Sequence, residues 1–254
     1  MGRFLGSAAL GIYALAYNLM LLPLSRLVYP IQQTLLPALS RIQDDPERIV
    51  RLWLRANRLV AALVVPVLVG MAVVAPDFVS VVLGRRWERL VPVLQILTAA
   101  AIVQSLGSLS TTILVAAGRS GSLFRFSILS SVLQVSAFVV GLHWGLKGVA
   151  FCYVLANVVV VPILVRMTSR TLDIAPMRIA QNLVGVCVAV LLMATATVLL
   201  RSGLVHVGVG APLRLVAVVV AGIAVYLAFC AWLVPELVGE IGQLVPRARR
   251  GART

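Results

Sequence analysis

The stretch 10–40 constrains the fold more than any other part of the chain. It contains no acidic residue and a single basic one, Arg26. As a continuous helix its 31 residues would be about 46 Å long, whereas the hydrocarbon core of a bilayer is about 30 Å thick. We therefore expect a membrane helix that tilts, kinks or extends into water, and then a turn at 44–47 where a second helix begins.

The composition of the whole chain leads to the same class of protein. Of its 254 residues, 61% are apolar and only 12% are charged, whereas soluble domains average about 45–50% apolar and about 25% charged residues. The three cysteines each lie within an apolar run, so we expect buried packing residues and no disulfide. The sequence therefore predicts an all-α polytopic membrane protein.

We predict about seven transmembrane helices from the apolar runs and their boundary residues. Pro46 begins the second of them, which we expect to kink near Pro66. The short segment 76–90 contains Trp and Arg side chains and predicts an interfacial or re-entrant piece. Gly145 and Gly148 predict a tight hairpin turn between the fourth and fifth helices. The predicted spans are 10–40, 46–75, 91–117, 122–143, 148–167, 179–200 and 213–234.

Lysine and arginine are distributed unevenly between the two ends of these helices. Of the 22 basic residues, fourteen lie at one end, seven lie at the other, and Arg26 lies within a span. By the positive-inside rule the first end is cytoplasmic, which places the N-terminus outside and the C-terminus in the cytoplasm. The larger set is Arg41, Arg48, Arg51, Arg55, Arg58, Arg119, Arg125, Arg166, Arg170, Arg178, Arg247, Arg249, Arg250 and Arg253. The smaller set is Arg3, Arg85, Arg86, Arg89, Lys147, Arg201 and Arg214.

A net charge of +14 is also typical of proteins that bind nucleic acid. Here the charge is spread over the loops of a membrane protein. We therefore interpret it as a topology determinant and as a source of attraction to anionic lipid. The partner that it predicts is the membrane, and we expect no nucleic acid.

A polar stripe runs along the first predicted span. Its prolines recur every seven residues, and a polar residue follows each proline by three. On an α-helix this spacing places all six residues on one side. A proline frees backbone carbonyls one turn earlier, and at membrane depth only protein or water can satisfy them. We therefore expect the stripe to face inward, onto a water-lined path. The stripe consists of Pro23, Arg26, Pro30, Gln33, Pro37 and Ser40.

Residues for catalysis or ion coupling are sparse. All eight carboxylates lie in predicted loops, links or the tail, so this sequence offers no buried acid for a proton or sodium relay. It has no zinc-ligand cluster, no phosphate-binding glycine loop and no nucleophile with a neighbouring base. We therefore predict no enzyme activity, no metal site and no cofactor. The carboxylates are Asp44, Asp45, Glu47, Asp77, Glu88, Asp173, Glu236 and Glu240.

Four segments resemble, in this order, the second half of bacterial polysaccharide exporters of the O-antigen flippase type. They are GRFLG (2–6), LGIYALAY (10–17), LPALSRIQDD (36–45) and VLGRRW (82–87), with AGR (117–119) and GLKGVA (145–150) as weaker matches. These exporters are the lipid-linked oligosaccharide flippases of the multidrug/oligosaccharidyl-lipid/polysaccharide superfamily. The resemblance extends over about residues 2–170.

The resemblance implies two six-helix lobes around a central cavity, sometimes with two extra C-terminal helices. On that template residues 1–170 form the second lobe, with helices that correspond to the eighth to twelfth of the family. Residues 171–254 are the two extra helices and a basic cytoplasmic tail. The first lobe and the seventh helix have no counterpart in this sequence. A misplaced start, a truncated gene and a fragment are all open explanations.

By resemblance, the implied function is transport of a polyprenyl-pyrophosphate-linked oligosaccharide across the bacterial plasma membrane by alternating access. The partner would be a separate N-terminal lobe or a second copy of the chain. The alternative is a non-transporting membrane scaffold, or a degenerate remnant, associated with a polysaccharide assembly complex. The sixth and seventh spans are almost entirely aliphatic, so we expect them at the periphery or against the lipid tail.

Arg26 is the strongest single-residue indication of a site, because it lies near the middle of its span, too deep for easy snorkelling. Two interpretations are open. In the first, its guanidinium helps to bind the pyrophosphate of the lipid-linked sugar. In the second it is structural and caps carbonyls freed by Pro30, or it lies nearer the interface than its position indicates.

Neutral polar side chains complete the candidate binding site. Amide and phenol groups within the spans suit sugar recognition, although helix packing in lipid uses the same groups and is the better explanation for any one of them. The candidates for the cavity-facing site, besides Arg26, are Tyr17, Asn18, Gln33, Gln104 and Gln134.

Overall fold

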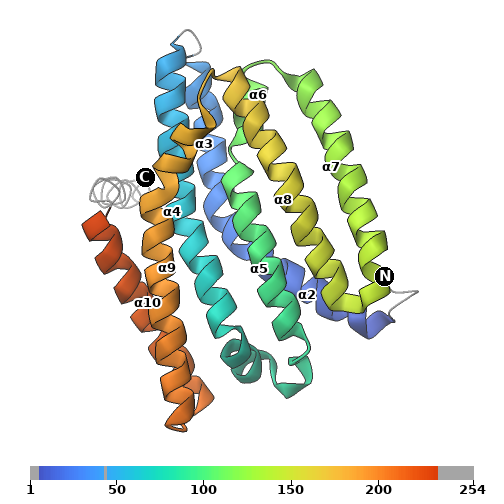
Figure 1. Ribbon diagram of the computed structural model, residues 1–254, viewed down its shortest axis with the longest axis vertical. Coiled ribbons are helices and arrows are strands. Elements are labelled where there is room, and N and C mark those ends of the chain that lie inside the picture. Colours follow the sequence, from blue (N-terminus) through green and yellow to red (C-terminus); the bar gives the residue numbers. More distant parts are fainter. Residues whose placement is uncertain (1–5, 43–44, 234–254) are drawn as a thin grey trace, which may run out of the picture.

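Every element in the described part of the chain is helical (Figure 1). The computed structural model describes residues 6–42 and 45–233, and it confirms the predicted all-α fold. The predicted basic tail with Glu236, Glu240 and the last four arginines lies outside the described residues, as do Arg3 and Asp44. The elements are α2 (Ser7–Pro23), η1 (Leu24–Val28), α3 (Tyr29–Ser40), α4 (Pro46–Phe78), η2 (Val79–Leu83), η3 (Arg85–Trp87), α5 (Leu90–Gly107), α6 (Ser110–Ala116), α7 (Ser120–Gly141), η4 (Leu142–Trp144), α8 (Gly145–Thr171), α9 (Pro176–His206) and α10 (Ala211–Leu233).

Within the described residues, 6 helical stretches are long and apolar enough to cross a membrane. The fourth of them, Ser120–Thr171, is a hairpin in which η4 separates α7 from α8. The six stretches therefore provide seven crossings, in agreement with the seven predicted helices. The chain is a multi-pass membrane protein.

The first crossing is one long path built from three elements. α2 and α3 are joined by the π-helix η1, and together they run from Ser7 to Ser40. These 34 residues would be about 51 Å long as a helix. In Figure 1 the path crosses the bundle obliquely, behind α5 and then up beside α4, so the expected tilt is present.

The second crossing is longer than predicted, and the expected separate segment at 76–90 is wrong over its first half. α4 continues through Pro76 to Phe78 and then into the π-helix η2. Gly84, with a φ of 87°, ends this path, because a glycine adopts a positive φ without strain. Only 84–89 form the link to α5.

Neighbouring helices supply hydrogen bonds that allow prolines inside α4. Each proline leaves the carbonyl four residues earlier without its helical donor. The carbonyl that Pro66 leaves without a donor is that of Ala62, and the Tyr226 hydroxyl of α10 donates to it at 2.7 Å. The carbonyl that Pro76 leaves without a donor is that of Ala72, and Nε2 of Gln95 on α5 donates to it at 2.9 Å. The helix passes both prolines because side chains of other helices satisfy its backbone.

The predicted hairpin between the fourth and fifth membrane helices is confirmed. Gly145 turns the chain with a φ of 68°. A Cβ atom on Gly141 would lie 2.6 Å from the Cα atom of Val149, and one on Gly148 would lie 2.4 Å from Cβ of Trp144. Such distances exclude any side chain at either glycine, so the close approach of α7 and α8 depends on them.

The main hydrophobic core lies between α2, α4, α5 and α8, around side chains such as Met20, Trp53 and Leu94. A second, smaller cluster joins α4 to α9 and α10 and includes Val186 and the buried Cys230. α9 and α10 lie at one edge of the bundle in Figure 1, as predicted for the sixth and seventh spans. Cys187, in contrast, is exposed, which corrects the prediction that all three cysteines are buried.

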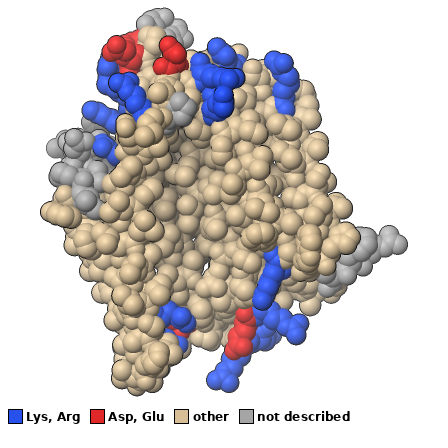
Figure 2. Space-filling view, in the orientation of Figure 1, with Lys and Arg blue, Asp and Glu red and all other residues tan. Residues whose placement is uncertain are grey.

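Charged side chains gather at two opposite ends of the molecule, and the band between them is uncharged on the face that Figure 2 shows. One end carries the turns α3–α4, α6–α7 and α8–α9, and the other carries α4–α5, α7–α8 and α9–α10. The two predicted sets of arginines and lysines therefore lie at opposite ends of the bundle, as far as the described residues extend.

Candidate functional site

Arg26 lies in the π-helix η1, near the middle of the first crossing. Pro30 gives a local reason for the wider turn, because it has no N–H and its ring crowds the carbonyl of Arg26 four residues earlier. The Arg26 side chain is exposed. It makes no hydrogen bond or ion pair within residues 6–42 and 45–233. The predicted structural role, a cap on freed carbonyls, therefore has no contact to support it.

The predicted polar stripe lies on the open face of the first crossing and not toward the core of this lobe. Arg26, Gln33 and the predicted Asn18 are all exposed, and Pro23 is the one stripe residue that is buried. The opposite side of the same path packs into the core through Met20, Val28, Leu35 and Leu39. The inward, water-lined orientation of the stripe stays a prediction, because the described helices leave this side of the first crossing uncovered. We call the surface of Asn18, Arg26 and Gln33 the open face.

Hydroxyl side chains along the first crossing donate to carbonyls of their own helical path. Thr34 Oγ1 donates to the carbonyls of Pro30 and Ile31 at 3.2 and 2.9 Å. Ser25 Oγ donates to Leu22, and Ser40 Oγ to Leu36, both at 3.1 Å. None of these bonds involves Arg26, whose guanidinium has no hydrogen bond or ion pair within the described residues.

Two other predicted residues, Tyr17 and Gln104, meet inside the lobe in a hydrogen-bond network. Nε2 of Gln104 donates to the Tyr153 hydroxyl at 2.7 Å and to Oδ1 of Asn157 at 3.0 Å. The Tyr17 and Tyr153 hydroxyls lie 3.4 Å apart. Asn157 Nδ2 donates to the Tyr153 carbonyl at 2.8 Å. The network joins α2, α5 and α8, and its geometry is that of interhelical packing.

An aromatic cluster surrounds this network. The rings of Tyr13 and Tyr17 are stacked at 6.3 Å, and Phe138 of α7 lies edge-on to both Tyr13 and Tyr153 at 5.8 Å. Such edge-to-face contacts are favourable beyond the area that they bury. The Tyr13 hydroxyl is buried without a hydrogen-bond partner among the described residues. Tyr17 and Gln104 are therefore partly buried within the lobe, apart from the open face.

Gln134 belongs neither to the open face nor to the hydrogen-bond network of Tyr17 and Gln104. Its Nε2 donates to Ser130 Oγ at 3.0 Å within α7, and it has no hydrogen bond to another predicted site residue in the described part. The neighbouring amide Gln32, which sequence reasoning passed over in favour of Gln33, makes the interhelical contact. Its Nε2 donates at 2.7 Å to the carbonyl of Ser108, where the third crossing breaks between α5 and α6.

Asp77 is the residue that the sequence analysis most clearly misplaced. It lies within α4, its side chain is 2% exposed, and it accepts from arginines of two other helices. Nε of Arg201 on α9 donates to it at 2.7 Å, and Nε of Arg214 on α10 donates at 2.8 Å. The expectation that no carboxylate is buried in a span is therefore wrong. Two guanidinium groups on one carboxylate form a closed, charge-assisted contact that ties α9 and α10 to α4.

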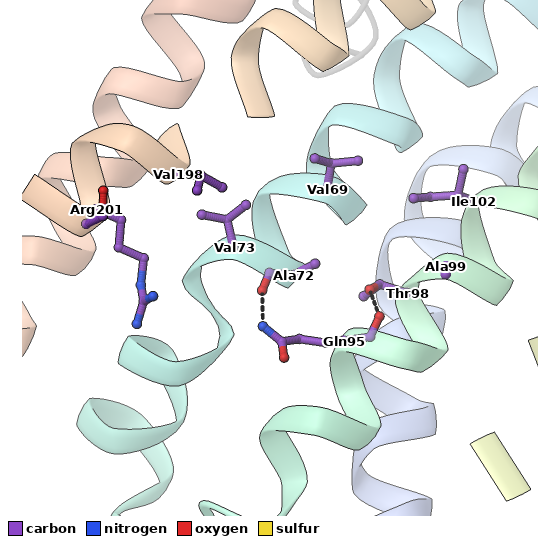
Figure 3. Close-up of a pocket in the computed structure, with 10 residues that line it drawn as sticks. Val69, Ala72, Val73, Gln95, Thr98, Ala99, Ile102, Val198 and Arg201 are labelled. Atoms are coloured by element: carbon purple, nitrogen blue, oxygen red, sulfur yellow. Dashed lines mark hydrogen bonds between the residues drawn. The ribbon is translucent and has the colours of Figure 1, made fainter. Parts of the chain in front are cut away.

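A groove of about 410 Å³ lies between α4, α5 and α9, beside this contact (Figure 3). Its lining is mostly apolar, and its polar side chains already have partners in the protein. Gln95 is held by Ala72 and Arg201 by Asp77, while Thr98 and Ser202 donate to carbonyls of their own helices. The groove therefore offers few free groups for a sugar, and the open face is the better candidate for a polar ligand.

Comparisons with known proteins agree with the resemblance inferred from the sequence. Residues 1–92 match the model of a family described as polysaccharide biosynthesis protein. Over 160 residues the chain is 32% identical to the lipopolysaccharide biosynthesis protein WzxC of Escherichia coli K12. The matched region is 63% of this chain and 32% of WzxC. Over 162 residues it is 29% identical to the teichuronic acid biosynthesis protein TuaB of Bacillus subtilis 168, and the matched region is 63% of this chain and 33% of TuaB. The chain thus spans about a third of the length of these relatives.

The fold provides an independent comparison. The lipid II flippase MurJ, in an inward closed conformation, superposes on 91% of this chain with a TM-score of 0.72 and 15% sequence identity. The superposed part is 48% of the MurJ chain. The chain therefore shares its helical arrangement with about half of that structure. Together with the sequence matches, this confirms the resemblance of this multi-pass membrane protein to flippase-type polysaccharide exporters.

Proposed function

We propose that this chain forms the second lobe of a flippase that moves a lipid-linked oligosaccharide across the bacterial plasma membrane. Relatives named for lipopolysaccharide and teichuronic acid biosynthesis support a polysaccharide precursor as the cargo. The fold shared with a lipid II flippase supports transport of a lipid-linked sugar. In this proposal the chain carries out no catalysis, needs no metal or cofactor, and binds no nucleic acid.

The observation that carries the proposal is the setting of Arg26. A guanidinium at membrane depth is costly unless a polar partner meets it. Arg26 is exposed without such a partner in the described residues, so its partner comes from outside them. A pyrophosphate fits a guanidinium well, because two parallel N–H groups can donate to its oxygens. Asn18 and Gln33, on the same face, offer neutral hydrogen-bonding groups for sugar hydroxyls.

The open face also defines where the rest of the transporter would lie. In flippases of this kind, two lobes rock about a site at their interface. We propose that a first lobe, supplied as a separate chain or replaced by a second copy of this one, covers the open face and encloses the ligand. Without it, polar groups of the open face meet lipid, which is unfavourable.

The test is complementation in a bacterial strain that lacks its own flippase. This chain is expressed with a first lobe from a related exporter, and surface polysaccharide is measured. We expect export to fall by at least about tenfold for Arg26→Ala, with partial recovery for Arg26→Lys. Arg178→Ala, an exposed arginine near the start of α9, is the matched control and should export normally.

Three outcomes would contradict the proposal. Normal export by Arg26→Ala would remove this residue from the site. Loss of export together with loss of protein from the membrane would favour a structural arginine. No export with any partner would favour the non-transporting scaffold. Restoration of export by this chain without any first lobe would instead show that a second copy replaces the first lobe.

We also propose that the end of the bundle with the larger arginine set is cytoplasmic. The positive-inside rule supports this orientation. Single cysteines at Arg48 and at Arg86 test it in intact cells with an impermeant thiol reagent, in a background where the three native cysteines are replaced. We expect labelling of Arg86→Cys but not of Arg48→Cys, and the reverse pattern would invert the topology.

A further inference from the structure

The end of α3 and the first turns of α4 form a basic pocket at one end of the bundle. It has a volume of about 660 Å³ and is lined by four arginines, Arg41, Arg48, Arg51 and Arg55, together with three apolar residues. Figure 2 shows the basic side chains gathered at this end of α3 and α4. Arg41 directly follows α3 as its C-cap residue, and the other three arginines lie on the first turns of α4. Positive charge from two helices therefore converges on one concave surface.

The spacing of the arginines explains this convergence. Arg48, Arg51 and Arg55 are separated by three and four residues, so they share one side of α4. α3 ends beside that side and adds Arg41 from the opposite direction. Arg119, Arg125 and Arg170 lie at the same end of the bundle and are also exposed, but they do not line this pocket. A topology determinant requires only the number of arginines, whereas this arrangement also places them around a cavity.

The acidic groups near the pocket compensate only part of its charge. Glu47 forms an exposed ion pair with Arg51 at 3.1 Å. Asp45 accepts the backbone N–H of Arg48 at 3.0 Å and so caps α4. The guanidinium groups of Arg41, Arg48 and Arg55 have no ion pair within residues 6–42 and 45–233. Among the described residues, the pocket thus keeps an excess of positive charge.

This excess favours a phosphate-bearing ligand. Guanidinium groups bind phosphate oxygens in a bidentate manner, and several of them around one cavity suit a group with more than one negative charge. Basic pockets at the ends of membrane helices bind phosphate headgroups of lipids. The pocket is separate from Arg26, because Arg41 lies fifteen residues beyond it along the same path, or about 22 Å.

We propose that Arg41, Arg48, Arg51 and Arg55 form a second site, which binds a phosphate-bearing anion at the end of the bundle. The ligand is either the phosphate headgroup of an anionic phospholipid at the membrane surface or a soluble diphosphate. The site does not depend on the proposed transport function.

Two binding experiments on the purified full chain distinguish the two sources. In the first, inorganic diphosphate is titrated into the chain in detergent and the heat of binding is measured. In the second, the chain is placed in nanodiscs of phosphatidylcholine alone or of an equimolar mixture with phosphatidic acid, and retained lipid is measured by native mass spectrometry. The test variant replaces Arg41, Arg48 and Arg55 by Gln. The control replaces Arg119, Arg125 and Arg170 by Gln, which removes the same charge at the same end.

We expect one of the two probes to bind the unmodified chain in a one-to-one ratio. Loss of three arginines from the pocket should weaken that binding about 100-fold, and the control should retain most of it. Binding of diphosphate identifies a soluble ligand, and specific retention of phosphatidic acid identifies a lipid headgroup. Equal weakening of probe binding in both variants would show that binding depends only on the total positive charge at this end, and would overturn the proposal. Absence of binding by either probe to the unmodified chain would overturn it as well.

Discussion

Two arginine settings in this molecule differ in what surrounds the guanidinium group. Arg201 and Arg214, from α9 and α10, both contact the carboxylate of Asp77, which is buried in α4. Arg26, in η1, is exposed and has no acidic partner within the described residues. The chain itself supplies the counter-charge for Arg201 and Arg214, whereas its described residues supply none for Arg26.

The difference shows how to separate structural from ligand-binding charge in a membrane protein. A charge in or near the hydrocarbon must be paired, either by the same chain or by a molecule that the chain binds. Where a carboxylate is already supplied, the arginines hold helices together. Where it is not, the arginine is available to an anion. The comparison predicts a large loss of stability when the first setting is disrupted and almost none when the second is.

The largest effect is expected when the setting of Arg201 and Arg214 loses its carboxylate. Asp77→Asn leaves two arginines with reduced exposure and no counter-charge, which should destabilise the chain by about 3–5 kcal/mol. Thermal unfolding of the purified chain in detergent measures the loss. Glu47→Gln, which removes an exposed ion pair with Arg51, is the control and should leave the melting temperature unchanged.

A compensating variant makes this test sharper. Replacing Asp77 by Leu together with Arg201→Met and Arg214→Met removes all three charges at once. Apolar replacement of a buried ion pair is often neutral or stabilising, so most of the lost stability should return. Unchanged unfolding of Asp77→Asn would show that the contact does not hold α9 and α10 to α4.

An intermediate effect is expected for the neutral network inside the lobe. Gln104→Leu removes the hydrogen bonds to Tyr153 and Asn157 but adds no unpaired charge. Two interhelical hydrogen bonds in a membrane protein contribute about 1 kcal/mol together. The same unfolding measurement should therefore show a smaller loss than Asp77→Asn. Gln134→Leu, whose bond stays within α7, is the control. Normal stability of Gln104→Leu with impaired export would instead return Gln104 to the binding site.

The sequence was sufficient for the number of crossings, the hairpin and the position of Arg26, because apolar runs, glycines and a lone charge are local features. It was insufficient for contacts between distant residues. The sequence predicts a boundary at Pro76, because nothing local shows that Gln95 satisfies the carbonyl of Ala72. It predicts a loop at Asp77, because the partners of this carboxylate, Arg201 and Arg214, are 124 and 137 residues away. Which side of the first crossing is buried likewise depends on the other helices.

The smallest effect on stability is expected at Arg26, and it provides the strictest test of the comparison. An exposed side chain without a partner in the described residues contributes little to folding, so Arg26→Ala should change the free energy of unfolding by less than about 0.5 kcal/mol. Unfolding of the purified chain in detergent measures this directly, beside Asp77→Asn in the same conditions.

The alternative interpretation gives a different result. If the guanidinium capped carbonyls freed by Pro30, its removal would leave them unsatisfied in the described lobe and lower stability by about 1–3 kcal/mol. In that case Pro30→Ala, which restores a backbone N–H, should rescue Arg26→Ala. A stable Arg26→Ala chain that no longer supports export would assign the arginine to the ligand, because its contribution would then be made only when the anion is bound.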